Sequence, residues 1–180
     1  MQDAERLAAV RDAMGPDARI RIDANAAWQV DEAVYAITEL ERAAGGLEYV
    51  EQPCASIEEL AAVRRRVDVP IAADESVRRA EDPLRVARAD AADVLVMKVQ
   101  PLGGIHRCLE LAEQAGLPIV VSSALETSIG LSAGLALAAA LPDLPHDCGL
   151  GTASLLTADL VTQPLHTRDG ALPAIRPAAD

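Results

Sequence analysis

Six short apolar runs recur along the chain at intervals of roughly 25 residues, and each closes on a polar or glycine residue. They are residues 19–23, 47–51, 69–74, 93–98, 118–123 and 147–151. The runs are rich in β-branched residues and do not alternate, so each is expected to be a strand buried on both faces. This repeat constrains the fold most, because buried strands at this spacing need covering helices and form a parallel sheet with right-handed crossovers.

Helices are expected between these strands. The stretches that carry helical patterns are residues 31–44, 56–67, 81–89, 104–114 and 127–141, with another at 3–13 ahead of the first strand. Asp31 is a candidate N-cap, and Ser56 followed three residues later by Glu59 has the pattern of a capping box. Gly116 and Pro142 stand where the last two helices are expected to end.

The predicted fold class is α/β, a (β/α)8 TIM-type barrel, N-terminally truncated so that about six of the eight βα units are present. An open doubly wound sheet is the rival, but it would put functional residues mainly at one switch point. Here chemically able residues end almost every strand, as in a barrel whose catalytic face collects the strand C-termini. We expect residues 1–165 to form this partial barrel and 166–180 to form a C-terminal tail.

Composition argues against several classes of function. Aromatic residues make up 2% of the chain and the net charge is −12, which disfavours binding to nucleic acid and to anionic lipid. The chain opens without a secretory leader pattern, and its longest apolar stretch, 129–141, is too short to span a bilayer. Cys54, Cys108 and Cys148 show no C-x-x-C spacing and are expected to be reduced thiols of a cytoplasmic protein.

Three carboxylates end consecutive strands, namely Asp23, Glu51 and Asp74. In a barrel these strand ends are neighbours, and carboxylates brought together repel one another unless a cation lies between them. Oxygen ligands favour Mg²⁺, with Mn²⁺ next, although each acid alone could equally cap a strand end or a helix. Asn25 and Glu75 are candidates to orient these metal ligands, with ordinary capping as the alternative.

Lys98 ends the next strand and is the only lysine among 16 basic residues, so surface charge is otherwise supplied by arginine. A lysine can lose its proton when it is partly desolvated, which suits a base or a compact cation beside a developing oxyanion. The alternative is a lysine that extends out of the barrel end into water.

Two further strand ends carry candidate substrate-binding groups. The hydroxyls and N–H groups of Ser122 and Ser123 could hold a substrate carboxylate, or the serines could cap the following helix. Gly149 and Gly151 would let the backbone approach a ligand closely, but a turn would use glycine as well.

Four motifs, in this order and at βα spacing, make the chain resemble the enolase superfamily, in the branch of muconate-lactonising enzyme. They are Asp23-Ala24-Asn25, Glu51-Gln52-Pro53, Asp74-Glu75-Ser76, and Lys98 followed by Pro101-Leu102-Gly103-Gly104. The closer likeness is to the o-succinylbenzoate synthase family of actinobacterial type. Residues 48–54, 72–76, 122–128 and 148–152 carry it.

The resemblance implies a Mg²⁺-dependent syn dehydration in menaquinone biosynthesis. The substrate would be a succinyl-hydroxycyclohexadiene carboxylate, converted to o-succinylbenzoate through a metal-stabilised enediolate. By similarity Asp23, Glu51 and Asp74 hold Mg²⁺ and Lys98 stabilises the intermediate as a cation, in keeping with the lysine and Mg²⁺ chemistry of this superfamily. The family also has a Lys-x-Lys pair, which supplies the acid/base, and a capping domain. Both are expected upstream of this sequence, so the missing N-terminal part of the barrel and the cap are implied partners.

Two alternatives remain open. One is another reaction of the superfamily: N-acylamino-acid racemisation, dipeptide epimerisation or muconate cycloisomerisation. Epimerases tend to place an Asp-x-Asp pair at the last strand end, and residues 148–152 lack one. The other alternative is an inactive barrel fragment or an assembly partner.

Overall fold

The computed structural model describes residues 2–173, and the chain divides into two compact units. The first unit comprises residues up to 76 together with 85–94, and the second comprises 77–84 together with the residues from 95 onward. Helix α4 (Asp82–Arg88) and strand β4 (Val94–Met97) contain the points where the chain passes between the units.

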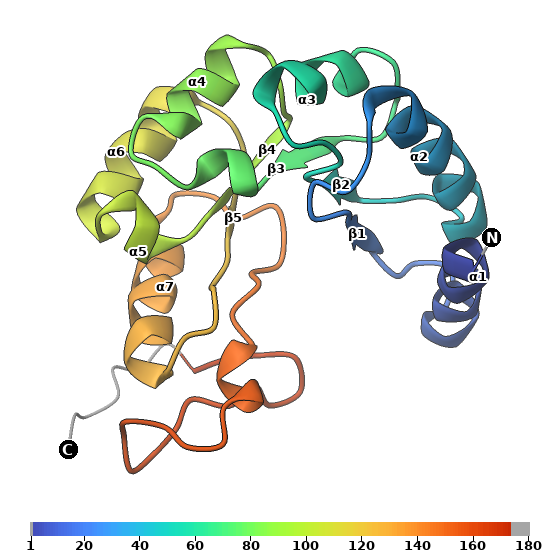
Figure 1. The fold of residues 1–180 in the computed structure, drawn as a ribbon. Coiled ribbons are helices and arrows are strands. Elements are labelled where there is room, and N and C mark those ends of the chain that lie inside the picture. Colours follow the sequence, from blue (N-terminus) through green and yellow to red (C-terminus); the bar gives the residue numbers. More distant parts are fainter. Residues whose placement is uncertain (1, 174–180) are drawn as a thin grey trace. The chain divides into compact units, whose positions relative to one another are not determined.

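The first unit contains three parallel strands with helices between them (Figure 1). Its elements are α1 (Gln2–Met14), β1 (Arg21–Asp23), α2 (Val30–Ala44), β2 (Tyr49–Glu51), α3 (Ile57–Arg64) and β3 (Ile71–Ala73). Strand β2 pairs with β1 through Ile22 and Val50, and with β3 through Val50 and Ile71. The predicted strands and helices of this unit are confirmed, with strands shorter than the apolar runs.

Caps fix where α2 and α3 begin. Ser56 accepts a hydrogen bond from the Glu59 backbone N–H at 3.2 Å, and the Glu59 carboxylate accepts from the Ser56 N–H at 2.9 Å, which confirms the capping box. The expected N-cap at Asp31 is wrong, because α2 begins one residue before it and Gln29 occupies the cap. There Glu32 accepts from the Gln29 N–H, so the same box operates with an amide in place of a hydroxyl.

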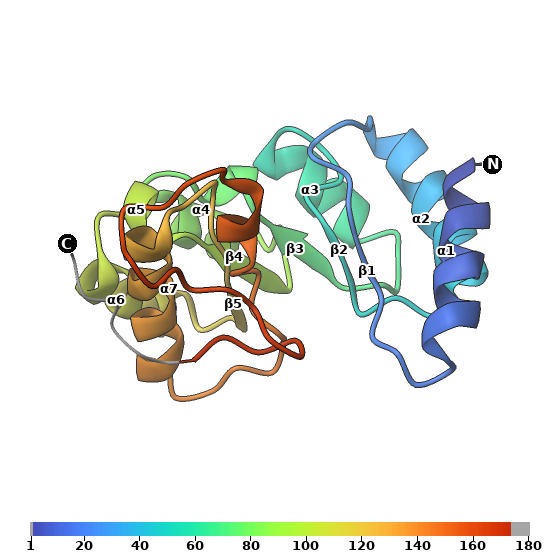
Figure 2. The ribbon, with the colours of Figure 1, turned by 90° about the horizontal axis from the view of Figure 1, so that it is seen from below.

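Helix α1 has no buried residue, yet it lies along α2 in both views (Figure 1 and Figure 2). Arg11 provides the link. Its guanidinium donates to five backbone carbonyls, those of Gly15, Pro16, Ala18, Ala44 and Gly46. Ala44 is the last residue of α2 and the other carbonyls follow α1 or α2, where helical hydrogen bonding leaves acceptors unused.

The second unit contains a parallel pair of strands and two longer helices that pack on each other. Its elements are the short helix η1 (Glu75–Val77) at the boundary, β4, α5 (Val99–Leu102), α6 (Ile105–Ala115), β5 (Ile119–Val121), α7 (Ser128–Ala140) and η2 (Thr152–Leu155). Leu95, Val96 and Met97 pair with Ile119, Val120 and Val121. The helices expected at 81–89, 104–114 and 127–141 are confirmed to within a residue or so at each end.

The sixth expected strand, 147–151, is wrong as a strand. The structure forms a single parallel bridge there, between Ser122 and Gly149, and the chain then turns into η2. Two glycines in five residues supply little side chain to pack and lose much backbone entropy on ordering, which weakens a strand. Among the described residues, regular strands therefore number five.

Asp159 holds the segment after η2 against the start of α7. Its carboxylate accepts from the backbone N–H and the hydroxyl of Ser128, at 3.0 and 2.7 Å. The Ser128 hydroxyl in turn accepts from the Leu165 N–H at 2.7 Å. Because the N-cap residue Thr127 makes no side-chain cap, Asp159 caps this helix from a distant part of the chain. The boundary expected at 165/166 stays a prediction, and residues 174–180 of the expected tail lie outside the described part.

The interior is built from aliphatic residues, as the composition required. Ile37, Leu60, Val50 and Leu137 are fully buried, and Tyr49 is the one aromatic in the described core. Cys54, Cys108 and Cys148 are free thiols. Within residues 2–173, no helix has the length and apolar character needed to cross a bilayer.

Candidate functional site

The first unit carries the candidate metal ligands at its strand ends. Asp23 closes β1 and Glu51 closes β2, and the two are register partners on neighbouring parallel strands. Register partners project to the same face of a sheet, so both carboxylates lie on one face at the C-terminal edge. Asp23 is exposed and Glu51 is half-buried.

Asp74 follows β3 directly. Glu51 pairs with Ala72, and Asp74 stands two residues beyond Ala72, so the side-chain alternation of the strand directs Asp74 to the face that Glu51 shares. Its exposed fraction is 4%, so this carboxylate is removed from bulk water. The sheet register thus places three carboxylate-bearing residues along one edge.

The donor chemistry of this edge fits a hard divalent cation, since the three residues supply carboxylate oxygens and no sulfur or imidazole. Their side chains are not gathered into a coordination shell: among residues 2–173 no group of three or more His, Cys, Asp or Glu side chains is arranged to hold a metal ion. The assignment of Asp23, Glu51 and Asp74 as metal ligands stays a prediction that the backbone register supports.

Asn25 and Glu75 flank these carboxylates in different ways. The Asn25 backbone N–H donates to the Asp23 carboxylate at 2.8 Å, and Asn25 has a positive φ of 47°. The Asp23 side chain thus forms an Asx turn with the backbone two residues on. Asn25 lies in this turn, and asparagine tolerates the left-handed conformation. The contact restrains the Asp23 side chain through the Asn25 backbone. Glu75 begins η1 and is half-buried beside Asp74. The orienting role predicted for both stays untested.

A pair of polar side chains on β1 and β2 precedes the carboxylates on the same face of the sheet. Arg21 and Tyr49 are register partners two residues before Asp23 and Glu51, so they share their face. Arg21 donates to Tyr49 Oη and to the Glu48 carboxylate, each at 2.9 Å. Burial raises the pKa of Tyr49 to about 12, so the phenol stays protonated beneath the carboxylates.

The second unit carries the candidate lysine. Lys98 follows β4 immediately and forms the N-cap position of α5 in an extended conformation. Its exposed fraction is 7%, whereas a lysine that only delivered its charge to solvent would lie largely in water. Burial of the sole lysine at a strand end is consistent with the catalytic role predicted for it, which stays a prediction.

Ser122 and Ser123 follow β5, and their hydroxyls contact the bridge at Gly149. Both donate to the Gly149 carbonyl, at 3.3 and 3.1 Å, and Ser123 Oγ also lies 3.0 Å from Thr152 Oγ1. A Cβ on Gly149 would lie 2.8 Å from Ser122 Oγ, so glycine permits this close approach. The end of β5 and the bridge at Gly149 are therefore joined by hydroxyl contacts. The substrate role of the serines and of Gly149 stays a prediction.

Gly151 shows no such requirement. It has φ −93° and ψ 10°, which other residues adopt, and a Cβ there would meet Thr167 Oγ1 at an ordinary 3.6 Å. Gly151 was predicted to let the backbone approach a ligand closely. That role stays a prediction, and its support is the position of Gly151 after the bridge.

Gln52 lies at this edge and has no predicted role in the site beyond its place in the Glu51-Gln52-Pro53 motif. Its side chain is fully buried and its amide makes four hydrogen bonds to residues around Asp74. A polar amide directly after the strand-end residue Glu51 and before Pro53 was the signal that could have identified it, because buried amides need partners.

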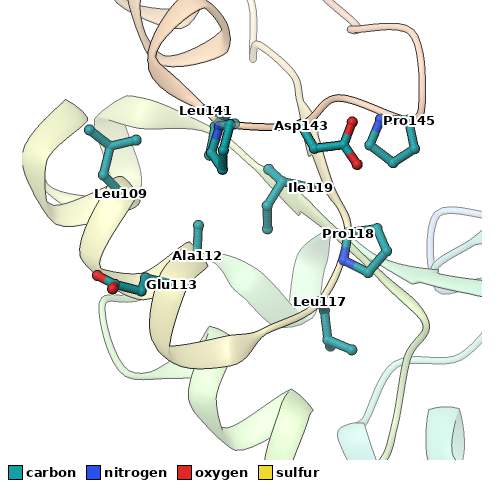
Figure 3. Close-up of a pocket in the computed structure, with 10 residues that line it drawn as sticks. Leu109, Ala112, Glu113, Leu117, Pro118, Ile119, Leu141, Asp143 and Pro145 are labelled. Atoms are coloured by element: carbon teal, nitrogen blue, oxygen red, sulfur yellow. The ribbon is translucent and has the colours of Figure 1, made fainter.

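A separate apolar cavity of about 500 Å³ lies at the other end of β5 (Figure 3). Leu109 and Ala112 of α6, Pro118 and Ile119 at the start of β5, and Leu141 after α7 line it. Because it opens at the N-terminal end of the strand, it is distinct from the Ser122 end where the candidate groups lie.

Comparison with known proteins identifies the family of this chain. Residues 1–177 match the family described as enolase C-terminal domain-like, and the chain belongs to that family. Its fold class is thus the α/β barrel domain of the enolase superfamily, as predicted.

The chain is similar to curated bacterial enzymes. It is 64% identical over 174 residues to the o-succinylbenzoate synthase of Thermobifida fusca (strain YX), a match that covers 97% of this chain and 54% of the relative. It is 57% identical over 176 residues to the o-succinylbenzoate synthase of Mycolicibacterium smegmatis, covering 98% of this chain and 53% of the relative. The chain thus spans about half the length of the curated relatives it matches.

Solved structures of the same superfamily share the fold at lower identity. A dipeptide epimerase from Enterococcus faecalis V583 has a TM-score of 0.86 at 33% identity, covering 98% of this chain and 52% of the epimerase. A muconate lactonizing enzyme from Pseudomonas putida has a TM-score of 0.87 at 30% identity, covering 99% of this chain and 51% of that enzyme.

Proposed function

We propose that the complete gene product containing this chain is a Mg²⁺-dependent o-succinylbenzoate synthase. The reaction removes the proton next to the carboxylate of a succinyl-hydroxycyclohexadiene carboxylate and expels the ring hydroxyl as water. The product, o-succinylbenzoate, is aromatic. The observation that carries the proposal is the 64% identity to a curated o-succinylbenzoate synthase over nearly the whole chain.

Asp23, Glu51 and Asp74 are the proposed Mg²⁺ ligands, and Mn²⁺ would fit the same oxygens. The support is their position at three successive strand ends, with the register that puts Asp23 opposite Glu51. When bound, a divalent cation supplies Lewis-acid stabilisation of the negative charge that develops on a substrate carboxylate. Asn25 and Glu75 are proposed to orient these ligands, Asn25 through its bond to Asp23.

Lys98 is proposed to act as the cation that stabilises developing negative charge on the substrate. Its support is its burial at the end of β4, where a desolvated ammonium interacts more strongly than in water. Ser122 and Ser123, with the backbone at Gly149 and Gly151, are proposed to bind substrate at the end of β5. The proton-transfer lysine expected from the resemblance belongs to a Lys-x-Lys pair, and these 180 residues contain no such pair.

A second candidate function is another reaction of the superfamily, since a dipeptide epimerase and a muconate lactonizing enzyme have solved structures with this fold. The identities to those enzymes, 33% and 30%, lie well below the identity to the synthases. The synthase reaction is therefore the better supported of the two.

The test is an assay of the purified complete gene product against both kinds of substrate in the presence of Mg²⁺. We expect rapid dehydration of the cyclohexadiene carboxylate and slower turnover, or none, of N-acylamino acids, dipeptides and muconate. A kcat/KM for a dipeptide or an N-acylamino acid above that for the cyclohexadiene substrate would contradict the proposal.

A further inference from the structure

We propose that Gln52 is a positioning residue, whose buried side-chain amide sets the spacing of the strand ends that carry the three carboxylates. The inference rests on the proposed metal site, because it concerns how Asp74 is held relative to Glu51. Gln52 itself contributes no atom to that site in this proposal.

All four hydrogen-bonding capacities of the amide are used. Oε1 accepts from the backbone N–H groups of Asp74 at 2.9 Å and Ser76 at 3.2 Å. Nε2 donates to the Cys54 carbonyl and to Ser76 Oγ, each at 2.9 Å. An amide offers two donors and two acceptor lone pairs, so this side chain is saturated within the protein.

The backbone of Gln52 extends the same connection across the sheet. Its N–H donates to the Ala72 carbonyl at 2.8 Å, and its carbonyl accepts from the Ala26 N–H at 2.7 Å. Ala26 belongs to the turn after Asp23, and Ala72 lies in β3 two residues before Asp74. One residue thus contacts the segments that follow β1 and β3 and directly follows Glu51 of β2.

Gln52 adopts a left-handed backbone conformation in this position. Its φ is +37°, a region that residues other than glycine seldom adopt unless the surroundings hold them there. Strain of this kind next to a candidate ligand is expected where geometry matters more than local stability. A glycine would relieve the strain but would lose all four amide contacts.

No other side chain reproduces the pattern. Asparagine is one methylene shorter and would not reach Asp74, methionine has the length without the hydrogen bonds, and glutamate keeps acceptor oxygens but loses both donors. The acceptor end is the part that touches Asp74, so we infer that ligand positioning depends on Oε1. The donor contacts to Cys54 and Ser76 orient the amide.

The experiment compares Mg²⁺ affinity with stability in variants of the complete gene product. Isothermal titration with Mg²⁺ gives Kd, binding of Mn²⁺ followed by electron paramagnetic resonance gives an independent Kd, and melts in EDTA give the metal-free Tm. We expect Gln52→Met to weaken both Kd values by about 10- to 100-fold, the range typical when a group that orients a metal ligand is lost.

Ser76→Ala is the matched control. It removes one acceptor from Nε2 but leaves Oε1 on Asp74 and Ser76 N–H groups, so it should lower the metal-free Tm and change Kd by less than about threefold, well short of that loss. A Gln52→Met protein that melts lower but binds Mg²⁺ like Ser76→Ala would overturn the inference, since a purely structural amide would behave in that way.

Gln52→Glu covers the case in which the methionine variant does not fold. It keeps an acceptor for the Asp74 N–H but loses the donors that orient the side chain, so the Mg²⁺ affinity should fall by less than about threefold, and a tenfold loss would also overturn the inference. The unaltered protein separates the two proposals: if it binds neither Mg²⁺ nor Mn²⁺, the metal site itself is wrong.

Discussion

Asp23 and Glu51 face each other as register partners at the ends of two parallel strands, and no cationic side chain is hydrogen-bonded to Asp23 among the described contacts. Like charges on neighbouring strand ends destabilise the folded chain unless a cation compensates them. A metal ion bound between these carboxylates should therefore raise the stability of the folded chain, and that increase can be measured.

Mg²⁺ is expected to raise the Tm of the unaltered protein, and Glu51→Gln should remove most of that rise. Binding to the native state adds about 2.7 kcal/mol at a hundredfold excess over Kd. Melts with and without Mg²⁺ measure it. Glu58→Gln, on the exposed face of α3, is the control and should keep the full shift. Equal shifts in the Glu51 and Glu58 variants would remove Glu51 from the site.

Lys98→Met should affect chemistry far more than folding. In the complete gene product we expect kcat to fall by about 10²–10⁴-fold, the range for a group that handles charge or protons in the transition state. Tm should hold or rise, because a buried cation placed for function is rarely placed for stability. Steady-state kinetics and melts on the same preparation decide it, and near-normal turnover would show the lysine to be incidental.

Asp159 should give the second unit an acid-sensitive link. Its hydrogen bonds from Ser128 lower its pKa below the usual 3.8, so the ionised form is favoured in the folded chain. A depressed pKa contributes stability that is complete above the unfolded value and is lost as the pH falls through the folded value. Asp159→Ala should cost about 1 kcal/mol at pH 7, the usual worth of a helix cap.

The difference between the unaltered protein and Asp159→Ala should be constant from neutral pH down to about 4.5 and should shrink below about pH 4. Urea melts across this range measure it. A difference that grows on acidification would mean that the carboxylate binds Ser128 in its protonated form.

Gly149→Ala should be destabilising because of Ser122, by about 1 kcal/mol as for mild overpacking. The added Cβ would lie 2.8 Å from Ser122 Oγ but 3.4 Å from its Cβ. Removing the hydroxyl should therefore recover part of the loss, and the double variant with Ser122→Ala should be less destabilised than the sum of the singles. Additive losses in urea melts would show that the two residues do not compete for space.

The strand and helix order was predictable from the sequence because buried parallel strands and capped helices leave local signals. Glu59 and Ser56 show this best, since both halves of their box lie within four residues. The prediction of a sixth strand was wrong because Gly149 and Gly151 weaken strand pairing in a segment whose spacing and apolar residues favoured a strand. The predicted N-cap at Asp31 was wrong because glutamine is rarely a cap residue. Glu32, which pairs with Gln29, was the better signal.

The candidate carboxylates were predictable as strand ends, but the contacts that hold them were not. Gln52 reaches Asp74 from 22 residues away, and Asp159 reaches Ser128 from 31. Long-range side-chain contacts of this kind depend on which loops the fold brings together. The spacing of residues along the chain does not predict which loops those are.

Helix α1 is expected to open as a separate cooperative element. Helix α1 contributes no fully buried side chain, so little apolar surface opposes its release, and Arg11 ties it to the end of α2 through the Ala44 and Gly46 carbonyls. Segments of this kind open at a free energy below that of global unfolding. The amides of α1 should therefore exchange with deuterium well before those of β2, and the rest of the unit should stay folded while they do.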